Sequence, residues 1–304
     1  MKKYLALIIA SASVVLFTLL FTVRIAMDLK NYESKKMEVA ELLSIENRMG
    51  DAWEWIPVDF LSPGDEKMEQ KAELEERAKH FYSKAVIDGW VLISVVIGYL
   101  VCLALIYRKS QLYYRSVGIA FIIASFCFLY LGLSSPFMEI EAYIDDFGVS
   151  MDLSFAQPEL GIEGRVYALY QMKSVAALIK FLYLGGNFFV AIVILLASVV
   201  FPLIKLLSSL IVFIWPGSKY SKEAIWVIGK LGKWSMADVM VASIFLAFFS
   251  FANMNVGVET GSSTLIGLYF YVAFVVFSIF SGYYLKKVTF DASLRKKEVD
   301  HTPA

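Results

Sequence analysis

A single lysine interrupts the most apolar stretch of the chain, residues 188–214. Lys205 lies roughly 6 Å from the midpoint of this stretch, at about 1.5 Å of rise per helical residue. A cation near the bilayer centre costs about 3 kcal/mol on insertion scales, and such residues usually face protein or a wet cavity. At helical spacing Ser198, Pro202 and Ser209 share the face of Lys205. This stripe predicts an intramembrane polar network that binds an anionic headgroup or relays a proton.

The alternative is that Lys205 only extends its ammonium toward the cytoplasmic headgroups, as long basic side chains do near a membrane surface. In that case it would have no part in function. Pro202 adds to the functional interpretation, because a proline lacks a backbone donor and frees a carbonyl one turn away.

A second polar group stands at the entry to the next apolar stretch. The chain reads Lys233-Trp234-Ser235-Met236-Ala237-Asp238 at this point. Trp234 and Lys233 suit the headgroup level on the cytoplasmic side. Ser235 and Asp238 share a helix face, and Asp238 is a further candidate for the network around Lys205. Equally, Ser235 caps the helix and Asp238 occupies its first turn, where the helix dipole favours an anion.

These residues need membrane helices to position them, and the composition provides for them. Hydrophobic residues make up 59% of the chain and charged residues 18%, which is typical of an integral membrane protein. Runs of about 20 apolar residues span a bilayer. Six stretches qualify, at approximately 4–26, 90–107, 116–134, 187–214, 237–254 and 264–285.

The first span and the loop charges predict the orientation. The apolar run near the N-terminus continues unbroken to Val23, longer than the apolar core of a cleaved signal, so we expect an uncleaved anchor. Lys and Arg gather in the loops that include 108–115 and 216–233, and acids prevail in 28–89 and 135–186. The positive-inside tendency then places both termini in the cytoplasm.

Other functional classes find little support in the sequence. The net charge is zero, so nothing suggests a nucleic-acid partner. No GxxxxGK[ST] phosphate-binding motif occurs. His80 and His301 are isolated, and Cys102 and Cys127 each fall inside a predicted span. We therefore expect no metal, no cofactor and no catalytic residues.

The segments outside the spans also predict structure. In the insert at 28–89, residues Asp65–Asp88 are rich in helix formers and should run into the second span at Trp90. Period-two alternation at 137–155 predicts a β-hairpin that turns at 145–148. Residues 166–184 are apolar with two lysines, which predicts a helix lying at the outer interface.

The two motifs together resemble the paraquat-inducible protein A (PqiA) family. The resemblance rests on Pro202 and Lys205 in one span, then on Lys233, Trp234, Ser235, Met236 and Asp238 at the entry to the next. It covers about 115–287. The family implies a four-helix membrane module with a small outer sheet, in inner-membrane proteins that work beside MCE-domain proteins in lipid trafficking. Unlike typical members, this chain carries one module rather than two and no Cys-rich zinc ribbon, which suggests a homodimer or a divergent role.

The expected organisation has three parts. Residues 1–114 hold the anchor helix, the insert and the second span; 115–287 form the PqiA-like module; 288–304 are a cytoplasmic tail. The fold class is an all-α polytopic membrane protein with a small extracytoplasmic β-hairpin and a helical insert. The expected function is non-enzymatic assistance of lipid transport or envelope homeostasis. The alternative is a membrane-anchored sensor or assembly scaffold that binds an extracytoplasmic partner through 28–89.

Overall fold

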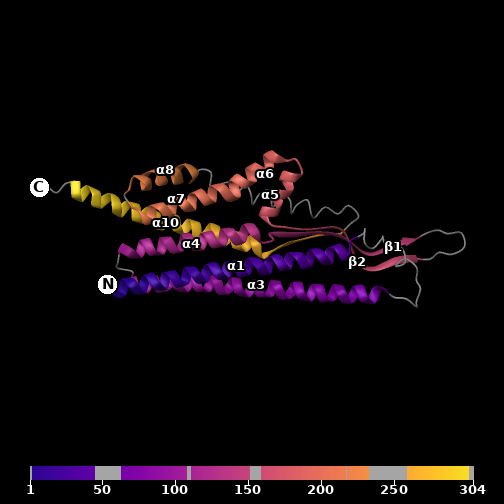
Figure 1. Ribbon diagram of the computed structural model, residues 1–304. Helices are drawn as coiled ribbons and strands as arrows, with labels where there is room; N and C mark the ends of the chain where they lie inside the picture. The colour runs from indigo at the N-terminus through magenta and orange to yellow at the C-terminus, as the bar shows by residue number, and fades with distance from the viewer. Residues whose placement is uncertain are drawn as a thin grey trace.

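The computed structural model describes residues 2–44, 63–107, 111–150, 159–216, 218–232 and 259–300. Long helices lie side by side, and a small sheet sits at one end of the bundle (Figure 1). The first turns of α1 and the last turns of α10 lie at the opposite end. In chain order the elements are α1 (Lys2–Leu42), α3 (Pro63–Tyr107), α4 (Gln111–Ser134), β1 (Met138–Ser150), β2 (Glu159–Lys173), α5 (Val175–Leu184), α6 (Phe188–Leu195), the π-helix η2 (Leu196–Val200), α7 (Phe201–Ile214), α8 (Lys219–Gly232), β3 (Glu259–Thr264) and α10 (Ile266–Asp300).

Five helices among the described residues are long and apolar enough to cross a membrane. They cover Ser11–Leu42, Glu69–Leu103, Tyr114–Ser134, Phe188–Ile214 and Ile266–Thr289. The prediction of a polytopic, mostly helical membrane protein is confirmed. The sixth predicted span, 237–254, lies outside the described residues.

Helices α1 and α3 form a long antiparallel pair that contains most of the predicted insert. As predicted, the helix that holds Asp65–Asp88 runs into the second span without a break, and it begins at Pro63, a residue suited to a first helical turn. The Ser11 and Tyr99 hydroxyls lie 2.6 Å apart near one end of the pair. The Tyr32 and Tyr82 rings lie 4.9 Å apart nearer the sheet. The first helix thus extends well past the predicted span end at residue 26.

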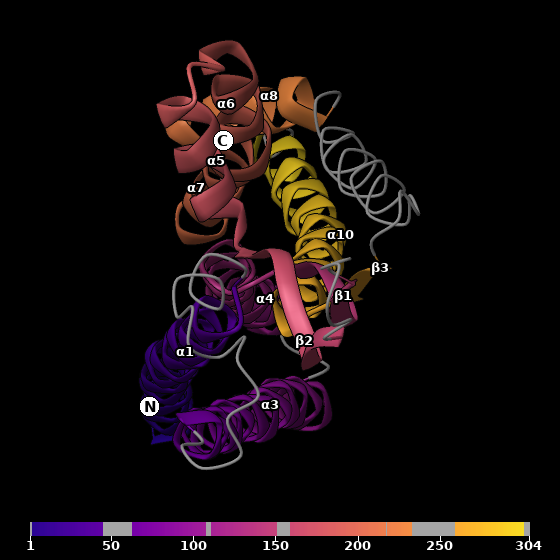
Figure 2. The same ribbon diagram turned by 90° about the vertical axis from the view of Figure 1, so that its right-hand side faces the viewer.

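Helix α4 lies between this pair and the remaining helices (Figure 2). Its buried residues Phe128 and Leu131 belong to the main apolar core. At Gly132 it approaches α10 so closely that a Cβ would lie 2.9 Å from the backbone N and Cα of Tyr271. Near its other end, Arg115 donates hydrogen bonds of 3.0 and 2.9 Å to the Phe213 and Ile214 carbonyls. These bonds satisfy terminal carbonyls of α7 that have no helical partner.

The sheet has three antiparallel strands in the order β2-β1-β3. Met138 of β1 pairs with Lys173 of β2 on one side and with Thr264 of β3 on the other. The predicted turn at 145–148 is wrong, because β1 continues through it to Ser150. Between Asp145 and Phe147 the register shifts because β2 has one residue more than β1 at this point, which forms a bulge.

The predicted helix over 166–184 is half wrong. Residues 166–173 complete β2, since their backbone groups pair with β1. Only Val175–Leu184 is helical, and Ser174 caps it by accepting a 3.1 Å hydrogen bond from the Ala177 N–H. The apolar content of this segment suited either structure, and strand pairing decided it.

Candidate functional site

The stripe around Lys205 lies on the continuous span made by α6, η2 and α7. Pro202 is buried in the first turn of α7, immediately after the π-helical turn. Proline has no backbone N–H, and its ring clashes sterically with the carbonyl four residues earlier. The backbone N–H of the preceding residue, Phe201, donates to the Leu196 carbonyl, which lies five residues earlier rather than the usual four. Such π turns inside α-helices occur frequently at functional sites.

The predicted network residues of this helix are buried to different extents. Ser198 is fully buried, Ser209 is buried, and Lys205 is half-buried. The Ser209 hydroxyl donates a 2.8 Å hydrogen bond to the backbone carbonyl of Lys205. The Ser198 hydroxyl has no hydrogen-bond partner among the described residues. A buried hydroxyl without a partner is costly, so Ser198 is a ready donor or acceptor for a polar group entering the span.

Further buried hydroxyls occur on the helices that pack beside this span. Ser278 and Ser281 of α10 are buried and have no hydrogen-bond partner among the described residues. Ser125 of α4 is fully buried and donates to the Phe121 carbonyl at 2.7 Å. The spans therefore hold several small polar groups besides the predicted stripe. The second predicted motif, Lys233, Trp234, Ser235 and Asp238, lies outside the described residues.

Two ion pairs join α1 to α3, and sequence reasoning missed both. The Arg24 Nε lies 2.8 Å from the Asp88 Oδ2, and the Lys84 Nζ lies 3.3 Å from the Asp28 Oδ1. Each helix supplies one base and one acid four residues apart, so the two pairs lie one turn apart between the antiparallel helices, with their charges reversed. Both carboxylates are buried, whereas both cations are partly exposed. The signal in the sequence was the repeated base-x-x-x-Asp spacing in Arg24/Asp28 and Lys84/Asp88.

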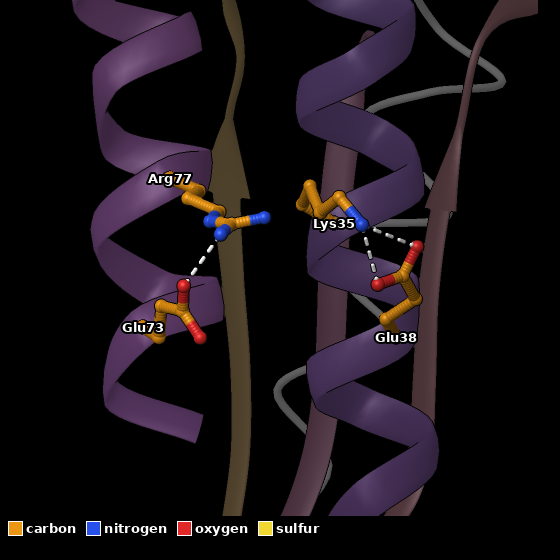
Figure 3. A network of polar contacts seen from close by, with 4 residues as sticks. All are labelled: Lys35, Glu38, Glu73 and Arg77. Carbon is orange, nitrogen blue, oxygen red and sulfur yellow. Dashed lines mark hydrogen bonds and ion pairs between the residues drawn. The ribbon is translucent and has the colours of Figure 1, made fainter. Parts of the chain in front are cut away.

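Further ion pairs lie within α1 and within α3. Lys35 holds both Glu38 oxygens at 2.9 and 2.7 Å within α1, and Arg77 contacts Glu73 within α3 (Figure 3). The Arg77–Glu73 pair is exposed and the Lys35–Glu38 pair is partly exposed, and exposed pairs are worth about 0–1 kcal/mol. They support the helices but do not join them.

A third polar cluster, also missed, joins α1 to the sheet around Glu139. The Tyr170 hydroxyl of β2 donates a 2.6 Å hydrogen bond to Glu139 Oε1, and the Ser263 hydroxyl of β3 donates one of 3.2 Å to Oε2. The Lys36 ammonium of α1 lies 3.6 Å from Oε1. Burial and the neighbouring carboxylate raise the pKa of Tyr170 well above its usual range.

Pro202 and Lys205 both fall in a region that matches a known protein family. Residues 162–290 match the family model of paraquat-inducible protein A. The predicted resemblance is thereby confirmed, although the match begins at 162 rather than near 115. The PqiA-like region begins in β2 and holds α5, the span with Lys205, α8, β3 and most of α10. It also contains Lys233, Trp234, Ser235 and Asp238. No curated protein and no solved structure was found to match the chain.

Proposed function

We propose that this PqiA-like membrane protein assists lipid transport across the bacterial envelope and does so without enzymatic chemistry. The supporting observation is the polar stripe of the PqiA-like region. A span exposed to the bilayer along much of its length buries Ser198 and Ser209 beside a π turn, and Lys205 is its only charged residue. Placing a cation there is costly, and such residues mark substrate or proton pathways.

The stripe suits a phospholipid in chemical terms. Lys205 offers a cation to a headgroup phosphate, and the Ser198 hydroxyl offers a hydrogen bond that no described residue takes. The same groups suit proton relay, in which a buried lysine releases a proton and takes one up again. In both roles the spans keep polar groups away from the acyl chains.

The proposed location is the inner membrane, with both termini in the cytoplasm. The support is the excess of Lys and Arg in alternate loops. In this orientation the sheet and the sheet-side ends of α1 and α3 project outside the cytoplasm. An MCE-type envelope protein is the partner that we propose for this end, and a second copy of the chain is proposed as the partner within the membrane.

A sensor or assembly scaffold is the second candidate. It is favoured by the contacts that attach α1 to the sheet. Besides the Lys36–Glu139 contact, the Tyr167 N–H donates a 2.9 Å hydrogen bond to the Leu43 carbonyl. A partner held on this end would be coupled mechanically to the spans. In that role the polar stripe would be dispensable.

Lipid analysis of the purified protein tests the first candidate. The full chain is extracted in mild detergent, and bound lipids are identified by mass spectrometry. Lipid transport predicts a phospholipid class enriched over the membrane extract, and that enrichment falls in Ser198→Ala and Lys205→Leu. A lipid profile equal to the bulk membrane in all three proteins would contradict the proposal and favour the scaffold.

A further inference from the structure

The corner between α5 and α6 exposes a set of large apolar side chains. Its members, here called the aromatic corner, are Phe181, Tyr183, Leu184, Phe188 and Phe189. Each is more than half exposed, and Phe189 is 81% exposed. The chain reverses here through Gly185 and Gly186, and Gly186 has a φ of 80°, which glycine adopts without strain. The Tyr183 and Phe188 rings meet edge to face at 5.1 Å, so the two sides of the reversal pack together.

The aromatic corner lies at the sheet end of a membrane span. Helix α5 follows β2 directly, and α6 begins the span Phe188–Ile214 (Figure 1). Five large apolar side chains exposed together are unusual outside an interaction site, and here they are continuous with the apolar side of a span. Its surroundings are therefore the bilayer itself, in the leaflet on the side of the sheet.

A cation without an acidic partner stands beside this surface. The Lys173 ammonium lies 3.4 Å from the centroid of the Phe181 ring. No carboxylate of the described residues forms an ion pair with it, and burial lowers the pKa of Lys173. Lys180 is exposed on α5. From Glu163 to Glu223 the sequence contains no other acid, so this membrane-proximal region is purely basic.

Such an arrangement matches the two parts of an anionic phospholipid. A phosphate needs a cation at the headgroup level, and basic residues near a charged membrane surface each contribute about 1 kcal/mol. An acyl chain needs an apolar surface that continues into the bilayer, which the exposed rings supply. A zwitterionic lipid carries its own cation and gains less from two lysines without acids nearby.

We propose that Lys173, Lys180 and the aromatic corner bind one anionic phospholipid from the leaflet on the side of the sheet. This inference deepens the proposed lipid transport by naming the lipid class, and it uses residues separate from the Lys205 stripe. The phosphate lies against the two ammonium groups, and the chains lie along Phe188 and Phe189. The site is open to the bilayer, so the lipid exchanges with the leaflet.

Photocrosslinking in nanodiscs tests this site in the full chain. The probes are phosphatidylglycerol and phosphatidylcholine, each with a diazirine in one acyl chain, and labelled peptides are mapped by mass spectrometry. We expect phosphatidylglycerol to label the α5–α6 peptides in preference to phosphatidylcholine. Two lysines worth about 1 kcal/mol each predict a loss of labelling of roughly tenfold or more in Lys173→Gln/Lys180→Gln. Lys79→Gln, which removes an exposed lysine of α3, is the matched control and should label normally.

Three results would overturn the proposal. One is equal labelling by both lipids, and another is unchanged labelling in the double variant. The third is loss of labelling on adding millimolar inorganic phosphate, which would indicate a site for the free ion. Phe189→Ala and Lys180→Gln alter exposed side chains, so reduced labelling in either supports the site even if the double variant folds poorly. The photolabel is read on the α5–α6 peptides, whereas the test of lipid transport reads which lipids co-purify and how Lys205→Leu changes them. Failure of one test is therefore distinguishable from failure of the other.

Discussion

The Nε of Arg24 lies 2.8 Å from Oδ2 of Asp88, and this contact joins α1 to α3. One turn away, Lys84 reaches back to Asp28 with the charges reversed. The two contacts fix the antiparallel register of the helices, because a shift of either helix breaks both pairs at once. A buried ion pair often adds little net stability but can specify a unique arrangement.

The first prediction concerns these two ion pairs between α1 and α3. Lys84→Met should cost about 3–5 kcal/mol, because it leaves the Asp28 carboxylate buried, with only 8% of its side chain exposed, and unpaired. Asp28→Asn should cost less, because Lys84 can turn to water. The double variant should recover most of the loss, since an asparagine in place of Asp28 leaves no unpaired charge buried. Unfolding in mixed micelles measures all three. Lys35→Met, which breaks an exposed pair, should change stability by less than about 1 kcal/mol. Additive losses in the double variant would contradict the assignment.

The second prediction uses two helical glycines in different surroundings. Gly132→Ala should destabilise the bundle by about 1–3 kcal/mol, because its Cβ would meet the backbone of Tyr271 and force α4 away from α10. A Cβ at Gly98 of α3 meets nothing within 4 Å. Gly98→Ala should therefore raise stability by up to about 1 kcal/mol, through helix propensity alone. Thermal unfolding in detergent compares them, and equal effects would rule out the close approach of α4 and α10.

The third prediction is a loss of stability at alkaline pH that depends on Tyr170. Its pKa is raised in the folded chain, so above about pH 10 the unfolded state ionises while the folded state keeps its proton. Its contribution is complete below pH 10 and is lost as the pH rises further. Tyr170→Phe should lower stability at neutral pH by about 1 kcal/mol through the lost hydrogen bond to Glu139. The same variant should show a shallower decline between about pH 9 and 11. An identical alkaline slope in wild type and variant would refute the raised pKa.

The fourth prediction separates the two interpretations of Lys205. If Lys205 functions within the span, Lys205→Leu should insert and accumulate normally yet fail to restore envelope integrity in a deletion strain. Its insertion should improve, since the change removes a cost of about 3 kcal/mol. Lys205→Arg should preserve headgroup attraction but abolish proton relay, because a guanidinium does not release its proton. Full complementation by Lys205→Leu would show that Lys205 only extends its ammonium to the headgroups and has no part in function.

The fifth prediction concerns orientation. Cysteines are introduced at Ser218, before α8, and at Thr260, in β3, in a chain with Cys102→Ala and Cys127→Ala. An impermeant thiol reagent added outside intact cells should label position 260 and not 218, because the proposed orientation places the basic loops in the cytoplasm. The reverse pattern would invert the proposed topology. Labelling of both positions after lysis serves as the control.

The sequence by itself determined the membrane class, the approximate positions of the described spans and the chemistry of the stripe. These features are local: an apolar run long enough to span, a lone lysine within it and a proline that disrupts the helical ladder. The motif residues also carried the likeness to the PqiA family, which the match over 162–290 confirms. The motif from Lys233 to Asp238 and the span after it remain predictions.

Only the tertiary structure decided which distant residues meet. The base-x-x-x-Asp spacing of Arg24 and Asp28 is also that of an ordinary pair within one helix, so the spacing alone does not tell that each meets a residue of α3. Residues 166–173 became a strand because β1 lay beside them, although their composition suited a helix as well. Residues 145–148 look like a turn but became part of β1, because β2 lies opposite them and pairs with them across a bulge. In each case the chain had several local solutions of similar free energy, and pairing with a distant segment selected one.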